Sequence, residues 1–174
     1  MPAFRHPVVA VSHGPGGLWL LSSEILSMSK SCQSAKTLQS LFEKLYPDGK
    51  HLPKRILVVS AHFEAFSGGF EISKAAKPDM IFDYYNLPAE AYAVNCPAEG
   101  DPEFAWKLEA SLARNNIKAK LVDRGFDHGV FVPMLLIRPR FDIPIVSMSI
   151  NSQLDSKAHF ELGRVLAAFR DEGR

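Results

Sequence analysis

Hydrophobic and polar positions follow two patterns along this chain, and each pattern predicts one kind of secondary structure. Runs of aliphatic and β-branched residues predict buried strands at 8–12, 55–60, 118–122 and 143–150, with a short strand within 68–73. Apolar residues spaced three and four apart predict helices at 35–46, 101–115 and 155–172, and an apolar run predicts a short buried helix at 130–137. This alternation predicts a three-layer α/β domain with a mainly parallel or mixed sheet.

Helix-capping residues mark the start of one predicted helix and the end of another. Asp101-Pro102-Glu103 combines an N-cap aspartate, a first-turn proline and an acid near the positive end of the helix dipole. Gly173 is placed to end the last helix as its C-cap. The strand, helix, strand order over residues 8–60 predicts a right-handed crossover between two parallel strands.

Two of the predicted strands run through a serine into a histidine. The first reads Val8-Val9-Ala10-Val11-Ser12-His13, and the second reads Ile56-Leu57-Val58-Val59-Ser60-Ala61-His62. If these strands are neighbours, His13 and His62 lie side by side at one rim of the sheet, where α/β folds build their sites. A third histidine, His128, lies in a loop between Asp127 and Gly129. One such histidine is more often structural, but three with similar placement favour a functional site.

Histidine chemistry limits what such a site could do. Two neutral imidazoles with one further ligand suit zinc or non-haem iron. A third histidine nearby could act as a general base or steady a bound oxygen species. The spacing of His13 and His62 matches no short metal-binding motif, so the spacing alone leaves the metal open. His6, His51 and His159 have contexts that suggest no role.

Composition and charge narrow the class of protein. The chain has 174 residues, 47% hydrophobic and 22% charged, which suits one globular domain. A formal net charge of +1 and scattered basic residues predict no nucleic-acid partner. Two cysteines form no disulfide framework, so a reducing, cytoplasmic location is expected. The N-terminus lacks the apolar core of a signal peptide, and the longest apolar run is too short to span a bilayer, so no membrane association is expected.

A loop rich in aromatic residues, 82–92, contains Tyr84, Tyr85 and Tyr92. It could line a pocket for an aromatic substrate, or large side chains could simply pin the loop to the core.

Several segments together resemble one enzyme family along essentially the whole chain. They are Ser12-His13-Gly14-Pro15, Ser60-Ala61-His62-Phe63-Glu64, Asp83-Tyr84-Tyr85-Asn86-Leu87-Pro88 with Tyr92, Gly100-Asp101-Pro102-Glu103, and Asp127-His128-Gly129-Val130-Phe131-Val132-Pro133. In their order and spacing the chain resembles the class III extradiol ring-cleavage dioxygenases, specifically the 4,5-DOPA dioxygenase branch.

The resemblance implies an iron(II) enzyme that binds a catechol through both hydroxyls, activates O₂ and splits the ring beside the diol. By resemblance, His13 and His62 are metal ligands, His128 is a catalytic histidine near the substrate, and Tyr84 and Tyr85 are substrate-binding. Fe(II) is the expected cofactor, with Zn(II) as a second candidate. Family members continue past the last helix with a further histidine and metal ligand, so this chain, which stops at Arg174, is expected to lack roughly the last third of the family's fold.

Three functions therefore stay open at the level of sequence. The first is extradiol cleavage of a catechol, either DOPA or another substituted catechol. The second is an inactive truncated isoform or fragment that acts at most as a binding partner, with self-association through an exposed sheet edge. The third is a zinc hydrolase using His13 and His62, which would need a third ligand and a metal-bound water.

Overall fold

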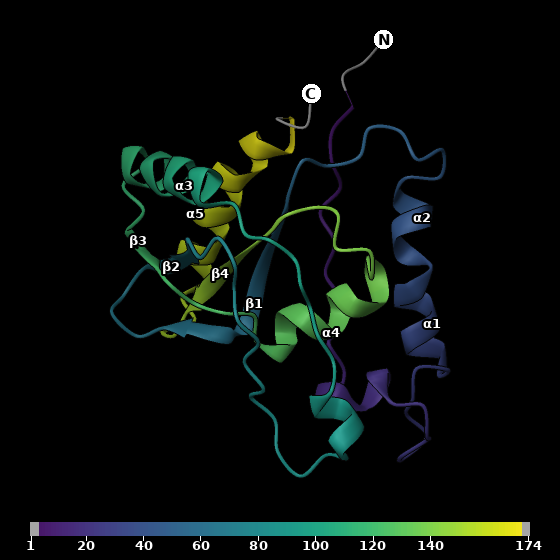
Figure 1. The fold of residues 1–174 in the computed structure, drawn as a ribbon. Coiled ribbons are helices and arrows are strands. Elements are labelled where there is room, and N and C mark those ends of the chain that lie inside the picture. The colour runs from purple at the N-terminus through teal and green to yellow at the C-terminus, as the bar shows by residue number, and fades with distance from the viewer. Residues whose placement is uncertain (1–3, 172–174) are drawn as a thin grey trace.

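The computed structural model describes residues 4–171 and contains one mixed sheet. Its strands are β1 (Ile56–Ala65), β2 (Phe70–Ser73), β3 (Ala119–Val122) and β4 (Ile145–Asn151), in the order β1-β4-β2-β3. β1 runs parallel to β4, β2 runs parallel to β3, and β2 meets β4 in antiparallel fashion. The predicted mixed α/β class is therefore confirmed, with β1 at one edge of the sheet (Figure 1).

Helices cover both faces of this sheet. They are α1 (Gln33–Gln39), α2 (Leu41–Leu45), α3 (Pro102–Arg114), α4 (His128–Ile137) and α5 (Ser156–Leu166), with 3-10 helices η1 (Gly16–Leu20), η2 (Ala89–Tyr92) and η3 (Ala167–Asp171). Successive residues of β4 pack into the hydrophobic cores on opposite faces of the sheet. Ile145 packs with α4 and η1, and Val146 packs with α3 and α5. This alternation makes the three layers seen in Figure 1.

Most predicted elements form within a few residues of their expected bounds. The Asp101 carboxylate accepts a hydrogen bond from the backbone N–H of Phe104 at 2.9 Å, as expected of an N-cap. The helix predicted at 35–46 is instead two short helices that meet at Ser40. α4 begins two residues before the apolar run, so His128 is a helical residue rather than a loop residue. Gly173 lies outside the described residues.

The prediction of a strand at 8–12 is wrong. These residues pair with no strand within the part of the chain that the structure describes, and the predicted crossover to β1 is therefore not formed. Val8 is 78% exposed, and Val9 and Val11 are also exposed. A β-branched run favours extended backbone, but a strand also needs a hydrogen-bonded neighbour. β1 takes its parallel partner from β4 instead.

The two ends of the described chain lie on the same side of the molecule (Figure 1). The backbone N–H of His6 donates to the Arg170 carbonyl, and the Arg170 guanidinium donates back to the His6 carbonyl. Among residues 4–171, no helix combines the length and apolar character needed to cross a lipid bilayer.

Candidate metal centre

The three histidines predicted from the sequence converge on one point of the structure. Ring centroids are 3.9 Å apart for His62 and His128, 4.6 Å for His13 and His128, and 4.7 Å for His13 and His62. One ligand nitrogen from each ring lies within 4.8 Å of the other two. His13 comes from the loop before η1, His62 from the second half of β1 and His128 from the first residue of α4, so the site joins three distant parts of the chain.

His62 lies in a β-bulge of β1, between Ser60 and Glu64, where the regular pairing with β4 is interrupted. β1 and β4 stay in register up to Ser60 and Ser149, then β1 advances to Glu64 while β4 advances only to Ile150. Bulges of this kind re-aim side chains next to active sites. The backbone of the bulge is held by two side chains: His62 N–H donates to the Ser60 hydroxyl at 3.2 Å, and Arg124 donates to the His62 carbonyl at 3.2 Å.

A fully buried carboxylate, Asp127, ties this bulge to the start of α4. It accepts a hydrogen bond from Ser60 Oγ at 2.6 Å and from the Arg124 guanidinium at 3.1 Å. The Asp127 carbonyl also accepts the first backbone bonds of α4. Gly129 allows this close approach, because a Cβ there would lie 2.5 Å from Ser60 Oγ. The same buried network therefore positions both His62 and His128.

His13 is positioned by a tight turn. Gly14 has a φ of +70° and donates its backbone N–H to Ser12 Oγ, while its carbonyl lies 2.8 Å from His13 Nδ1. A carbonyl can only accept, so Nδ1 of His13 carries the proton and Nε2 keeps its lone pair. A Cβ on Gly14 would lie 2.6 Å from the Trp19 ring, so the turn requires glycine for space as well as for its φ.

His128 is held by Asp83, which comes from the aromatic loop. Asp83 Oδ1 accepts from the His128 backbone N–H at 2.9 Å and lies 2.8 Å from His128 Nδ1. Burial alone would raise the pKa of Asp83, but the hydrogen bonds and charge of His128 outweigh it, and the pKa of this carboxyl lies below its usual value. An ionised carboxylate only accepts, so His128 Nδ1 donates, and in the neutral form of the ring Nε2 keeps a lone pair.

These imidazoles fit a transition-metal ion. His13 Nε2 and His62 Nε2 lie 3.1 Å apart. Two nitrogens each about 2.1 Å from one ion lie roughly 3.0 to 3.4 Å apart at angles between 90° and 109°. Neutral imidazole is a good ligand for zinc and for iron, and the Nδ1 atoms of His13 and His128 have the kind of second hydrogen-bonding partner that ligand histidines use.

The two tyrosines predicted to contact substrate have different surroundings. Tyr84 is buried, its ring centroid is 5.7 Å from that of His128, and its hydroxyl donates to the Ala91 carbonyl. Burial, with smaller contributions from Tyr92 and Asp83, raises the pKa of Tyr84 to about 12. Tyr85 is 81% exposed. The Tyr84 ring is therefore held in place beside His128, and the Tyr85 side chain is exposed to solvent.

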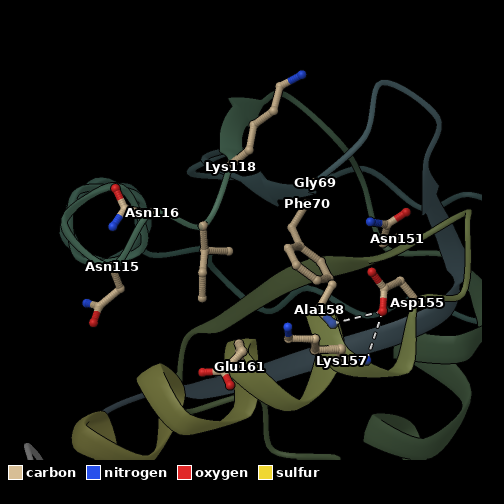
Figure 2. Close-up of a pocket in the computed structure, with 11 residues that line it drawn as sticks. Gly69, Phe70, Asn115, Asn116, Lys118, Asn151, Asp155, Lys157, Ala158 and Glu161 are labelled. Carbon is tan, nitrogen blue, oxygen red and sulfur yellow. Dashed lines mark hydrogen bonds between the residues drawn. The ribbon is translucent and has the colours of Figure 1, made fainter.

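A separate groove of about 360 Å³ lies away from the histidines. It is lined by the residues drawn in Figure 2, none of which was predicted as a site residue. Its Asp155 carboxylate is already engaged as the N-cap of α5, accepting from the backbone N–H groups of Lys157 and Ala158 (Figure 2). Asn151 likewise accepts from Gln153 within its own turn. Both of these polar groups are therefore already used by local turns of the fold.

Sequence reasoning found the histidines but missed most of the groups that orient them. Ser60 and Asp83 were both inside recognised segments, yet their functions were not predicted, because hydrogen-bond partners 45 to 67 residues away leave no local signal. Arg124, which contacts both His62 and Asp127, lies outside the recognised segments. Glu64, one of the carboxylates close in sequence to the histidines, is exposed and belongs to β1 beyond the bulge.

Comparison with known proteins identifies the family of this chain. The chain belongs to the family described as the catalytic LigB subunit of aromatic ring-opening dioxygenase, whose match covers residues 8–173. It is 41% identical over 173 residues to the dioxygenase tasH of Hapsidospora irregularis, covering 95% of this chain and 50% of that protein. It is 35% identical over 165 residues to a 4,5-DOPA dioxygenase extradiol of Beta vulgaris, covering 94% of this chain and 57% of that protein.

A solved structure shares the fold. The crystal structure of an uncharacterized protein from Escherichia coli K12 matches with a TM-score of 0.62 and 31% sequence identity, over 88% of this chain and 52% of that one. The chain thus spans about half the length of the curated relatives it matches.

Proposed function

We propose that this chain binds iron(II) through His13 and His62 and takes part in extradiol cleavage of a catechol by O₂. The observation that carries the proposal is the convergence of three imidazoles, two of which have their Nδ1 atoms committed to acceptors. Membership of the ring-opening dioxygenase family and relatives named 4,5-DOPA dioxygenase support a catechol such as DOPA as the substrate class.

Each residue has a distinct task in this proposal. His13 and His62 hold the metal, which when bound supplies Lewis acidity and redox chemistry toward a catechol and O₂. His128 stands beside them with a free Nε2 lone pair and accepts a proton from a catechol hydroxyl, while Asp83 supports the resulting imidazolium. Tyr84, with a pKa of about 12, stays neutral and bounds the site, and Tyr85 presents an exposed ring to the substrate.

The test is anaerobic loading with Fe(II), followed by O₂ uptake with DOPA and with simple catechols. His13→Ala and His62→Ala should each abolish tight metal binding and O₂ uptake. His128→Ala should keep the metal and lower turnover by about 10²- to 10⁴-fold, the usual contribution of a general base. His51→Ala is the matched control, because His51 stacks on Phe4 outside the cluster and should leave both properties unchanged.

Two outcomes would change the conclusion. O₂ uptake that survives both His13→Ala and His62→Ala would contradict the metal assignment. Tight metal binding by the wild-type chain without O₂ uptake would support the second function instead, an inactive fragment that acts at most as a binding partner.

A further inference from the structure

Asp83 presents one carboxylate oxygen to each of two histidines. Oδ1 accepts from the backbone N–H of His128 and lies 2.8 Å from its Nδ1. Oδ2 lies 3.6 Å from Nδ1 of His62. Asp83 comes from neither of the elements that carry those histidines, so the loop that follows the Met80–Phe126 bridge supplies a third support for the cluster. No role was assigned to this side chain from the sequence.

The position of Asp83 bears directly on which nitrogen of His62 holds a proton. A neutral imidazole has one N–H, either on Nδ1 or on Nε2. A carboxylate oxygen facing Nδ1 favours the Nδ1–H form, which leaves a lone pair on Nε2. Nε2 of His62 faces Nε2 of His13 at 3.1 Å, and the His13 proton is already fixed on Nδ1 by the Gly14 carbonyl.

The two forms of His62 have opposite consequences for the cluster. With the proton on Nε2, His62 donates to His13. The hydrogen bond then occupies the His13 Nε2 lone pair, and His62 Nε2 has no lone pair to offer a metal. With the proton on Nδ1, two lone pairs face each other at a distance suited to a shared cation and unfavourable without one. The contact between His13 and His62 is therefore either closed or open to a metal, depending on that proton.

We propose that Asp83 is a positioning residue that keeps His62 in the Nδ1–H form and so holds the His13–His62 pair open to a metal ion. This inference rests on the proposed function, because it takes His13 and His62 as metal ligands. It also assigns one carboxylate to both a metal ligand and the histidine that faces the substrate.

Asp83→Asn tests the proposal without removing the support of α4. The backbone N–H of His128 can only donate, so the amide oxygen of asparagine must face it and takes over the hydrogen bonds of Oδ1. The amide NH₂ then faces His62 Nδ1, which becomes an acceptor and leaves its proton on Nε2. The variant should therefore close the histidine pair while preserving the fold and the bonds to His128.

The first measurement is the tautomer of His62 in metal-free protein, from ¹⁵N chemical shifts of the imidazole ring at one fixed pH above 7. Wild-type protein should show His62 protonated on Nδ1, and Asp83→Asn should show it protonated on Nε2, with His128 unchanged. An unchanged His62 tautomer in Asp83→Asn would overturn the proposal.

The second measurement is the affinity for Zn²⁺, and for Fe²⁺ under anaerobic conditions, by calorimetric titration. Asp83→Asn should weaken binding about 10- to 100-fold, the range found when partners of ligand histidines are removed. Asp123→Asn is the matched control, because it makes the same chemical change at a carboxylate paired with Lys74, and it should bind as wild type does. Equal affinity in Asp83→Asn and Asp123→Asn would also overturn the proposal.

These readouts separate this inference from the proposed function. The tautomer is measured without metal, substrate or turnover. In one outcome, Asp83→Asn changes the tautomer and weakens Zn²⁺ binding while wild-type protein consumes no O₂. That result would support the positioning role of Asp83 and contradict ring cleavage by this chain. If O₂ uptake is present but the tautomer and affinity are unaltered in the variant, the positioning role falls and ring cleavage stands.

Discussion

Two segments of this chain have nearly the same sequence pattern and reach the same site by different routes. Residues 8–13 and residues 56–62 both run from valines through a serine into a histidine. The second segment belongs to β1 and pairs with β4 from Ile56 to Ser60. The first segment has no strand partner within the described chain, and its valines are exposed. The histidines at their ends nevertheless have ring centroids only 4.7 Å apart.

The difference shows that a strand pattern encodes extended backbone but not its partner. β1 gains its order from the ladder with β4 and from Ser60, whose hydroxyl is buried against Asp127. His13 gains its position from the Gly14 turn and from the aromatic side chains packed around it. Substitutions at matching positions of the two segments should therefore have very unequal effects.

The largest contrast is expected from a charge placed at a valine in each segment. Val58 is partly buried against the core that contains Phe131, and it pairs in register with Ser147. Val58→Asp should lower the free energy of unfolding by more than about 3 kcal/mol, because it buries an unpaired charge. Val8→Asp should change it by less than about 0.5 kcal/mol, since an exposed side chain loses little on substitution.

Urea unfolding followed by circular dichroism measures both variants. Similar losses in Val58→Asp and Val8→Asp would show that residues 8–12 have a buried partner, and the contrast between the segments would then be wrong.

The two serines give a contrast of intermediate size. Ser60 is buried and donates to Asp127 at 2.6 Å, whereas Ser12 is exposed and accepts from Gly14 N–H at 3.1 Å. Ser60→Ala should cost about 1 to 3 kcal/mol, since it removes a partner of a buried carboxylate. Ser12→Ala should cost less than about 0.5 kcal/mol. Thermal unfolding of the two variants side by side checks the difference, which vanishes if the Asp127 network adds nothing to stability.

The sequence predicted the mixed α/β fold and the convergence of the histidines better than it predicted how they are held. The strand at 143–150 was recognised because a strand that is buried on both faces is rich in aliphatic residues, which can be seen locally in the sequence. The failure at 8–12 has the opposite cause, since pairing depends on a distant strand. The histidines are oriented by Asp83, Ser60 and Arg124, largely through hydrogen bonds to residues far along the chain. The spacing of apolar residues in the sequence does not predict such contacts.

A further contrast separates the two requirements of the Gly14 turn. Gly14 and Gly49 both have positive φ, +70° and +64°, but a Cβ on Gly49 would meet nothing within 4 Å, while one on Gly14 would meet Trp19. Gly49→Ala should therefore report backbone strain alone, about 1 kcal/mol. Gly14→Ala should cost about 1 kcal/mol more from the clash, and it should also weaken metal binding because His13 moves. Equal unfolding free energies and unchanged Zn²⁺ affinity would show that the turn does not set His13.

The smallest effect at neutral pH, and the one that tests how the His13 loop is supported, concerns Tyr84. Its ring packs against Gly16 and Gly17, the first two residues of η1, directly after the His13 loop. Side-chain packing here replaces the strand pairing that supports β1. Burial favours the neutral phenol and raises its pKa to about 12, against about 10 in an unfolded chain. Because the folded-state pKa is the higher one, this stabilisation is complete below pH 10 and is lost as the pH rises toward 12.

Tyr84→Phe removes this dependence. The free energy of unfolding of the wild type should therefore fall more steeply than that of Tyr84→Phe between pH 10 and 12, with little difference in slope below pH 9. A difference titration of phenolate absorbance, wild type minus Tyr84→Phe, should isolate one tyrosine of the four with a midpoint close to 12. A midpoint near 10 would mean that Tyr84 is solvated and the His13 loop lacks this packing. β1, whose order comes from backbone pairing with β4, would then be the only one of the two segments with a rigid support.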